Sequence, residues 1–502
     1  MGVMRFTVHP AGLLDATTEI PQAFLCGFDG RVFPSRVEMD GNTLTFRRMN
    51  SESGKFHLPY PVQGFGRPIV STATLRESET PYCLALELAR GKICQVRNQL
   101  AVWESLGMQI PEDFVVSHRL AHRLFAQATG AKSDLAECSR LADQAIVKAH
   151  EAAAKLAKSY VRQRLAVRFK RSPQLPVSFG CRLNQEDLKL DNSLSFTDVF
   201  NAVGIPVEWH RIEPEEGTYH WENCDAVVNW AHERKLLMRA GPLLDFSENG
   251  LPQWLNQWGH DFYNLQSFIS DFVETAVSRY TGKIRVWELA TRANVGGAFK
   301  LNEEERLSLL ARTLEVARQV DGEAQFFLRI DQPWGEYQTR GEHRLSPIQF
   351  VDALLRFGTG LAGVNLEIPI GFNGRGNGPR DLLDFSRMID QWTVLEVPLN
   401  VSLCAPAATV TDALACDGIE VQAAHTGGVE WSEATQASWI TEYVSLLMAK
   451  QSVVAINWSY ISDASPHVFP NGGLVDARGR PKAGFTALSR CRSGQVLVSG
   501  LE

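Results

Sequence analysis

The sequence lacks the features that mark several large classes of protein. No stretch approaches the roughly 20 apolar residues of a membrane span, and the opening residues show no secretory pattern. The nine cysteines include no Cys-x-x-Cys pair, which argues against zinc ribbons and thioredoxin-type redox sites. The net charge of -7 lacks the basic excess of a nucleic-acid binder. We therefore expect a cytoplasmic protein with reduced thiols that binds neither membranes nor nucleic acids.

The N-terminal third of the chain changes character once. Residues 1–81 carry alternating apolar residues around Asp29-Gly30 and Asp40-Gly41, and Asp-Gly between such runs is a strong hairpin signal. Residues 82–172 have the apolar spacing and the Ala, Leu, Glu and Lys content of helices, with Ser133 and Asp134 as candidate caps. These patterns predict a β-rich, sandwich-like domain followed by a helical segment of two or three helices.

Residues 173–495 alternate short apolar strands with helical segments. The eight strand candidates, in chain order, are "PVSFGCRL", "FNAVGIPVEW", "LLMRAGPLL", "IRVWELAT", "AQFFLRID", "GVNLEIPI", "LNVSLCAP" and "VVAINWSY". Helical patterns lie between most of them, for example at 264–279 and 303–319. Eight such units in about 320 residues are typical of a (β/α)8 TIM barrel. The predicted fold class is thus α/β, a barrel preceded by the β-rich unit and the helical segment.

Three local sequence patterns do not indicate a functional site. "GTGLAG" at 358–363 precedes a strand, so it lacks the strand-then-helix geometry that cradles a phosphate. His118 and His122 stand four residues apart on a helix, but no third ligand accompanies them. The basic run 155–171 is expected to be the solvated face of a helix. We expect no cofactor and no metal site.

The candidate site lies where the barrel strands end, because active sites of such barrels form at that face. Carboxylates, an arginine and tryptophans at these ends suit a sugar, whose rings stack on aromatic faces and whose hydroxyls bind acids. The catalytic candidates are Glu208, Asp331 and Glu367. The substrate-binding candidates are Trp209, His210, Asp245, Glu288, Arg292, Asn294, Trp334 and Trp458. Strand alternation puts Glu288 and Arg292 on one face, where we expect an ion pair. The simpler interpretation of each acid at the mouth is an ion pair with Arg292 or Arg329.

Two stretches resemble glycoside hydrolase family 10, the xylanases. "FNAVGIPVEWHRIEPEEGTYHWENCDAVVNWAHERKLLMRAGPLLDFSENGLPQWL" shares the Trp before "IEP", the Gly-Thr-Tyr turn and the later "LPQWL" with the first half of that family. "HVFPNGGLVDARGRPKAGFTAL" is similar to the family's ending. The resemblance covers about residues 177–490 and implies a barrel and a saccharide ligand, either a sugar or a sugar acid.

The sequence departs from the family at its catalytic positions. On the fourth strand, Thr291 stands at the family's Asn and Arg292 at its acid/base Glu. On the seventh strand, Ser402 and Leu403 stand at the family's Thr and nucleophilic Glu. A retaining glycosidase needs two carboxyl groups about 5–5.5 Å apart, and neither Arg nor Leu can replace one. The departure implies that family-type hydrolysis is absent.

Three functions therefore remain open. The first is a saccharide-binding pseudoenzyme. The second is a divergent O-glycosyl hydrolase that uses relocated carboxylates at Glu208, Asp331 or Glu367. The third is a protein-interaction scaffold with a filled cleft. The fold alone does not choose between them, because one barrel hosts many chemistries.

Overall fold

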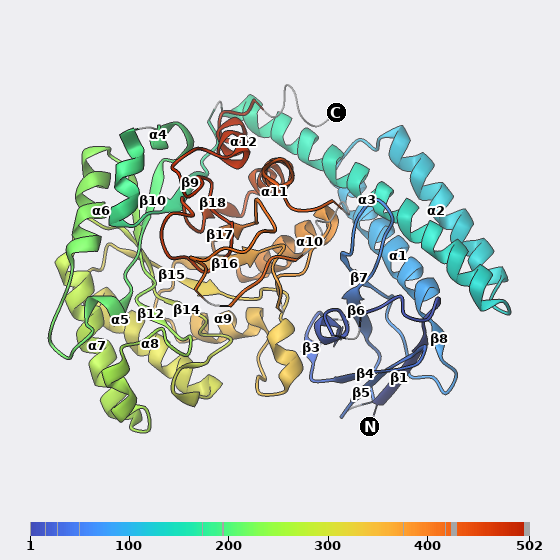
Figure 1. Cartoon of the computed structure of the whole chain (residues 1–502), viewed down its shortest axis with the longest axis horizontal. Helices are drawn as coiled ribbons and strands as arrows, with labels where there is room; N and C mark the ends of the chain where they lie inside the picture. Colours follow the sequence, from blue (N-terminus) through green and yellow to red (C-terminus); the bar gives the residue numbers. More distant parts are fainter. Residues whose placement is uncertain are drawn as a thin grey trace.

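The computed structural model describes residues 2–495 except 16, 28, 50, 173, 193, 194, 375, 417 and 423–428. Eight parallel strands close into a barrel in the order β10-β11-β13-β15-β16-β17-β18-β9 (Figure 1). These strands are β9 (Ser178–Arg182), β10 (Ala202–Ile205), β11 (Leu237–Ala240), β13 (Val286–Glu288), β15 (Gln325–Ile330), β16 (Gly363–Pro369), β17 (Leu399–Cys404) and β18 (Val453–Trp458). All eight lie within the stretches that the sequence predicted.

Helices cover the outside of the barrel. The longer ones are α6 (Glu222–Glu233), α7 (Phe262–Arg279), α8 (Glu303–Val320), α9 (Pro347–Arg356), α10 (Leu382–Trp392), α11 (Glu433–Ala449) and α12 (Ala483–Arg492). Short elements near the strand ends are α4 (Phe196–Val199), α5 (Trp209–Ile212), β12 (Leu244–Asp245) and β14 (Ala290–Thr291). Every residue of β16 and of β17 is buried, as expected for parallel strands with apolar contacts on both faces. The predicted (β/α)8 fold class is confirmed.

The N-terminal unit contains two four-stranded sheets, β4-β5-β1-β8 and β3-β2-β6-β7. Their strands are β1 (Gly2–Thr7), β2 (Phe24–Cys26), β3 (Val32–Phe33), β4 (Arg36–Asp40), β5 (Thr43–Arg48), β6 (Lys55–Pro59), β7 (Ile69–Ser71) and β8 (Tyr82–Cys83). Both predicted Asp-Gly hairpins form, as the antiparallel pairs β2–β3 and β4–β5. The sheets pack through Phe6 and Phe56, whose ring centroids are 5.0 Å apart.

Three helices connect this unit to the barrel: α1 (Leu84–Ser105), α2 (Glu112–Gly130) and α3 (Leu135–Arg171). The Asp134 side chain accepts two backbone N–H groups at the start of α3, as its predicted capping role requires. The basic residues near the end of α3 are not all solvated as expected. Lys158 binds Glu442 at 2.8 Å, and Arg168 donates to the Lys450 carbonyl at 2.9 Å. This basic face therefore joins α3 to the barrel.

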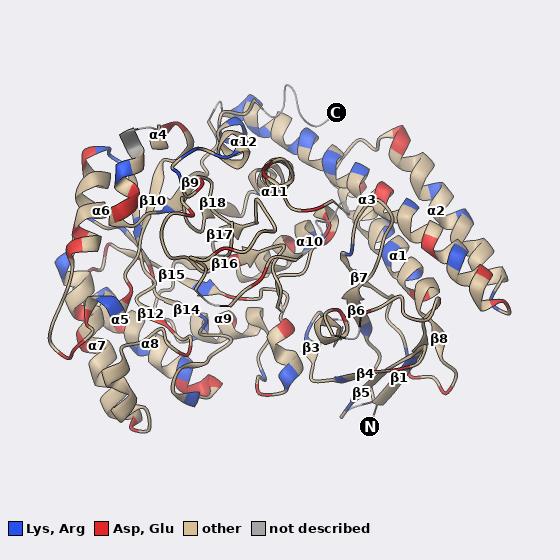
Figure 2. Cartoon of the chain, viewed as in Figure 1, with Lys and Arg blue, Asp and Glu red and all other residues tan. Residues whose placement is uncertain are grey.

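No described helix combines the length and the apolar character that crossing a bilayer requires. Figure 2 shows Lys and Arg interspersed with Asp and Glu along the barrel helices and along α2 and α3.

Candidate functional site

A cavity of about 390 Å³ opens at the carboxyl ends of the barrel strands. This volume lies within the range of about 300–1,000 Å³ that is usual for small-ligand sites. Six of the predicted site residues line it: Glu208, His210, Asp245, Glu288, Glu367 and Trp458. The cavity is not filled by side chains, so the expectation attached to the scaffold hypothesis is not met.

One arginine links two of the acids inside the cavity. Arg329 Nε lies 2.6 Å from Glu288 Oε1, and Arg329 Nη1 lies 3.3 Å from Glu367 Oε2. Burial lowers the pKa of Arg329, but the charges of Glu288 and Glu367 outweigh it, so this pKa is raised. The guanidinium therefore stays charged and bridges the two carboxylates.

Neutral side chains from neighbouring strands extend this ion pair network. Asn365 Nδ2 donates to Glu288 Oε2 at 2.7 Å, and Ser402 Oγ donates to Asn365 Oδ1 at 3.0 Å. Strands β16 and β17 pair in parallel, so Asn365 and Ser402 both point into the barrel by alternation. The network fixes Glu288 on both of its oxygens.

The surroundings of Glu367 change its acidity. Burial raises the pKa of Glu367 to about 7, although Arg329 opposes this rise. The Ser459 hydroxyl donates to Glu367 Oε1 at 3.3 Å. Glu367 is only 6% exposed, and it lines the cavity. It can therefore hold or release a proton near neutral pH.

The third glutamate of the cavity is paired with two arginines. Arg182 Nη2 lies 2.8 Å from Glu208 Oε1, and Arg211 Nη1 lies 3.0 Å from Glu208 Oε2. Asp245 nearby accepts the Ser247 backbone N–H at 2.8 Å. All three cavity glutamates therefore form ion pairs with arginine, and all three line the cavity.

Arg292 lies elsewhere than the sequence predicted. β13 ends at Glu288, and Arg292 adopts a left-handed backbone with φ of 57°, so strand alternation does not extend to it. Its N–H donates to Asp331 Oδ2 at 2.7 Å. Glu288 pairs with Arg329 instead, so the expected ion pair with Arg292 was wrong. Arg292, Asp331 and Asn294 are not among the described residues that line the cavity.

Asp331 and Asn294 support this loop. Asn294 is fully buried and exchanges two hydrogen bonds with the Asp331 backbone, at 2.7 and 3.2 Å. Asp331 also accepts from the Thr291 hydroxyl at 3.2 Å. Burial raises the pKa of Asp331. These contacts hold the backbone after β13 and bring neither side chain to the cavity.

The predicted tryptophans divide in the same way. Trp458 lines the cavity and donates its Nε1–H to the Gly472 carbonyl at 2.9 Å. Trp209 stacks on Phe272 in the apolar core, with ring centroids 4.4 Å apart. Trp334 lies 4.8 Å from the Arg380 guanidinium, measured to its ring centroid, and does not line the cavity either. Trp458 is only 2% exposed, so among the predicted aromatic residues that line the cavity His210 has the more accessible ring.

The seventh strand also needs a correction. Asn400 and Ser402 line the cavity, whereas Leu403 is fully buried in the apolar core between the strands and the helices. Leu403 therefore does not occupy an inward position, as the resemblance had implied for a nucleophile. No residue of β17 is acidic, so this strand supplies no carboxylate in either orientation.

Sequence reasoning missed two parts of the site. Arg182, Arg211 and Arg239 line the cavity. Arg239 lies on the predicted third strand. Alternation along that strand was the signal that could have found it. The rim segment 466–469 also lines the cavity, although its sequence indicated only the end of the barrel and no role in the site.

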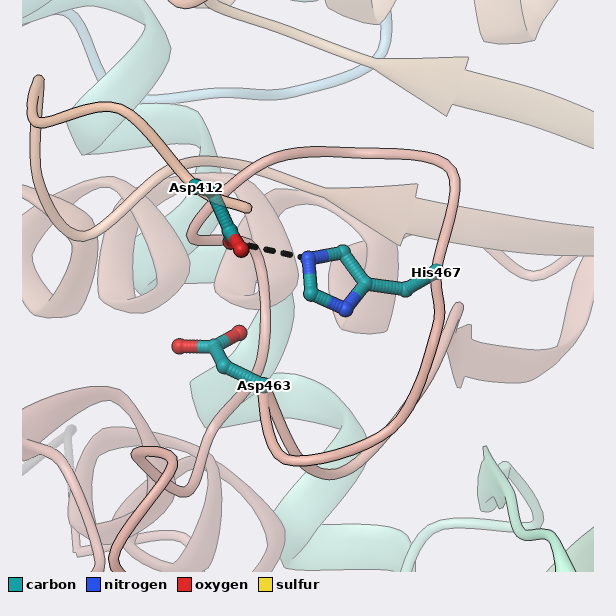
Figure 3. A group of neighbouring side chains, drawn as sticks. All are labelled: Asp412, Asp463 and His467. Atoms are coloured by element: carbon teal, nitrogen blue, oxygen red, sulfur yellow. Dashed lines mark hydrogen bonds and ion pairs between the residues drawn. The ribbon is translucent and has the colours of Figure 1, made fainter. Parts of the chain in front are cut away.

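A cluster of possible metal ligands lies beside this rim. Asp412, Asp463 and His467 offer ligand atoms within 4.8 Å of one another (Figure 3). His467 Nε2 contacts Asp412 Oδ2 at 2.9 Å, and His467 Nδ1 contacts the Ser465 carbonyl at 2.7 Å. The Lys482 ammonium forms an ion pair with Asp463. The hydrogen bonds of His467 and the ion pair with Lys482 already occupy the ligand atoms of this cluster. These contacts indicate a structural link between loops and not a metal site.

Part of the barrel is similar in sequence to known proteins. Residues 174–308 match the model of glycosyl hydrolase family 10. An endo-1,4-beta-xylanase of Agaricus bisporus is 26% identical over 144 residues, which are 28% of this chain and 42% of that protein. Endo-1,4-beta-xylanase 3 of Hypocrea jecorina is 28% identical over 126 residues, which are 24% and 35% of the two chains.

The chain therefore spans less than half the length of these relatives. Native xylanase 10B of Thermotoga maritima superposes with a TM-score of 0.49 at 14% identity, covering 67% of this chain and 98% of that one. The family match begins just before β9 and ends within α8. The barrel of this chain is thus similar to the barrels of glycosyl hydrolase family 10, whose model it matches over residues 174–308.

Proposed function

We propose that the barrel mouth binds a saccharide and does not hydrolyse it by the retaining route. The observation that carries the proposal is the bridge of Arg329 between Glu288 and Glu367. A retaining enzyme places the scissile bond between two carboxyl groups about 5–5.5 Å apart. Here a guanidinium bridges the two acids, so the bond has no access to both of them.

The composition of the cavity supports a saccharide as the ligand. Carboxylate oxygens accept hydrogen bonds from sugar hydroxyls, and amide and hydroxyl side chains on neighbouring strands supply further partners. The neutral polar side chains of the lining that serve this purpose are Asn184, Asn365, Asn400, Ser402, Asn457 and Ser459. The half-buried His210 adds a ring to the lining.

A second candidate function rests on Glu367. A buried carboxyl group with a pKa raised to about 7 is typical of a general acid in a glycosidase. Glu208 lines the same cavity and is the further acid that such a reaction would need. This alternative predicts hydrolysis that both Glu367→Gln and Glu208→Gln abolish.

A binding screen tests the proposal. Purified protein is melted with neutral and acidic disaccharides and trisaccharides at millimolar concentration, and the products are analysed by chromatography. We expect at least one sugar to raise the melting temperature and to be recovered intact. Glu367→Gln should weaken that binding about tenfold or more, since a charged acceptor contributes about 1.5–3 kcal/mol.

Control outcomes separate the candidates. Glu315→Gln, an exposed change on α8 outside the cavity, should leave binding unchanged. Release of smaller sugars, lost in Glu367→Gln, would replace the binding proposal with the hydrolase. The absence of any stabilising saccharide would remove both and leave the scaffold.

A further inference from the structure

The cavity contains one positive charge that no carboxylate neutralises. Its other three arginines form the ion pairs with glutamate described above. Arg239 also lines the cavity, yet within the described chain no Asp or Glu oxygen lies within 4.0 Å of its nitrogens. Arginine remains protonated at any relevant pH. Arg239 is therefore a cation that can pair with an anionic ligand.

The contacts of Arg239 are weak for a guanidinium with five donors. Nη2 lies 3.2 Å from Ser178 Oγ and 3.5 Å from Asn400 Oδ1, and both partners are neutral. Nε is inaccessible to solvent and has no hydrogen-bond partner in the described structure. Burial lowers the pKa of Arg239 to about 10, with only Glu288 acting to raise it. Uncompensated burial of this kind is costly unless a ligand supplies the missing charge.

Arg239 lies at the floor of the cavity. It is the third residue of β11, and it lines both the mouth cavity and a second hollow at the amino ends of the strands. Val286 and Phe327 also line both spaces, so Arg239 lies between the mouth cavity and the hollow below it. A ligand that fills the mouth and reaches this depth meets Arg239 last.

We propose that this floor binds the carboxylate of an acidic saccharide, a hexuronic acid residue whose C6 carboxylate is held by Arg239. The inference rests on the proposed saccharide site and names its ligand class. A planar carboxylate matches the fork of a guanidinium. Sugar hydroxyls on the same ring would face Glu288, Glu367 and Asn365 higher in the barrel. The Asn400 side-chain amide lies next to Arg239 and can donate a further hydrogen bond to the carboxylate.

The charges around the floor favour a monoanion. Glu288 is close enough to Arg239 to raise its pKa, and its two oxygens are already occupied by Arg329 and Asn365. A phosphate ester with nearly two negative charges would be repelled by Glu288, with one arginine to balance it. A single carboxylate avoids that repulsion.

The test compares three disaccharides that differ at one group: cellobiouronic acid, its methyl ester and cellobiose. Binding to the full chain is measured by calorimetry at pH 7.5. We expect the acid to bind at least tenfold more tightly than the ester, because only the acid supplies a charge to Arg239. Inorganic phosphate at the same concentration should not compete with the acid.

Variants locate the effect. Arg239→Gln should remove the preference for the acid over the ester, and Arg239→Lys should retain part of it. Arg312→Gln is the control, because it removes an exposed arginine on α8 outside the cavity, and it should leave the acid-to-ester ratio unchanged. If Arg239→Gln does not fold, the wild-type ratio alone decides.

Each remaining outcome is decisive. Equal binding of acid, ester and cellobiose would overturn the inference and leave the saccharide site standing. Tighter binding of phosphate than of the acid would overturn it as well, in favour of a general anion site. A protein that binds none of the three disaccharides and no other sugar would refute both the inference and the proposed function.

Discussion

Arg329 binds Glu288 and Glu367 at once, at 2.6 Å and 3.3 Å, and so joins three strands across the mouth of the barrel. All three side chains are mostly buried, with Glu367 only 6% exposed. Removing one partner of a buried ion pair costs more than the pair itself contributes, because charge is left without a counterpart. The bridge is thus a structural requirement of the cavity as well as a bar to retaining hydrolysis.

The first prediction concerns this bridge. Arg329→Met should lower the free energy of unfolding by about 3–5 kcal/mol, since two buried carboxylates lose their cation. Arg312→Met is the matched control: its partner Glu315 is half exposed, so the loss should stay below about 1 kcal/mol. Urea unfolding followed by fluorescence measures both. Losses of similar size in the two variants would show that the bridge stabilises the fold no more than an exposed ion pair does.

Glu367 gives a prediction for pH. Its native pKa of about 7 exceeds its ordinary value of 4.5, so the native state holds this proton more tightly than the unfolded chain does. The resulting stability is fully present below pH 4.5 and is lost as the pH rises through 7, on the order of 3 kcal/mol in total. Glu367→Gln keeps an acceptor for Arg329 and should remove this decline. Parallel stability profiles of variant and wild type between pH 4.5 and 8 would contradict the assignment.

Arg292 and Asp331 should respond to mutation in opposite ways. Arg292→Gly should leave stability unchanged or slightly raised, because φ of 57° suits glycine and the side chain does not line the cavity. Asp331→Ala should cost about 1–3 kcal/mol, because the Arg292 N–H and the Thr291 hydroxyl lose their acceptor. Thermal denaturation compares the two. A large loss in the glycine variant alone would mean that the arginine side chain matters.

The cluster at Asp412, Asp463 and His467 should not depend on a metal. Lys482 already provides the positive charge at Asp463, and both ring nitrogens of His467 contact oxygen acceptors. Neither EDTA nor 1:1 zinc should shift the melting temperature of the wild type by more than about 1 °C, a change that corresponds to about 1 kcal/mol for a chain of this length. A shift of several degrees on chelation would identify a metal that the side-chain contacts do not reveal.

The fold followed from the sequence because its signals are local. Strands such as β16 are buried along their whole length, so they read as short apolar runs. The two Asp-Gly turns fixed the hairpins of the N-terminal unit by their own chemistry. The packing of the basic end of α3 on the barrel was not predictable in the same way, since a charged helix face reads alike whether it meets water or a partner.

The positions of site residues were predictable from the sequence only where those residues lie on regular strands. Glu288 and Glu367 lie on regular strands, and alternation aimed them correctly. Arg292 lies beyond the break after Glu288, where a positive φ redirects the chain, and no spacing rule foresees that turn. The pairing of Glu288 with Arg329 depends on the stagger of strands β13 and β15, which a single sequence does not encode visibly.

The central claim is that the barrel mouth holds a saccharide and leaves it intact. Saturation-transfer NMR on the full chain with a mixed panel of neutral and acidic oligosaccharides tests both halves in one sample. The account predicts saturation transfer to at least one sugar and anomeric signals that stay unchanged after overnight incubation. The absence of transfer to every sugar, or the growth of new reducing-end signals that requires Glu367, would contradict it.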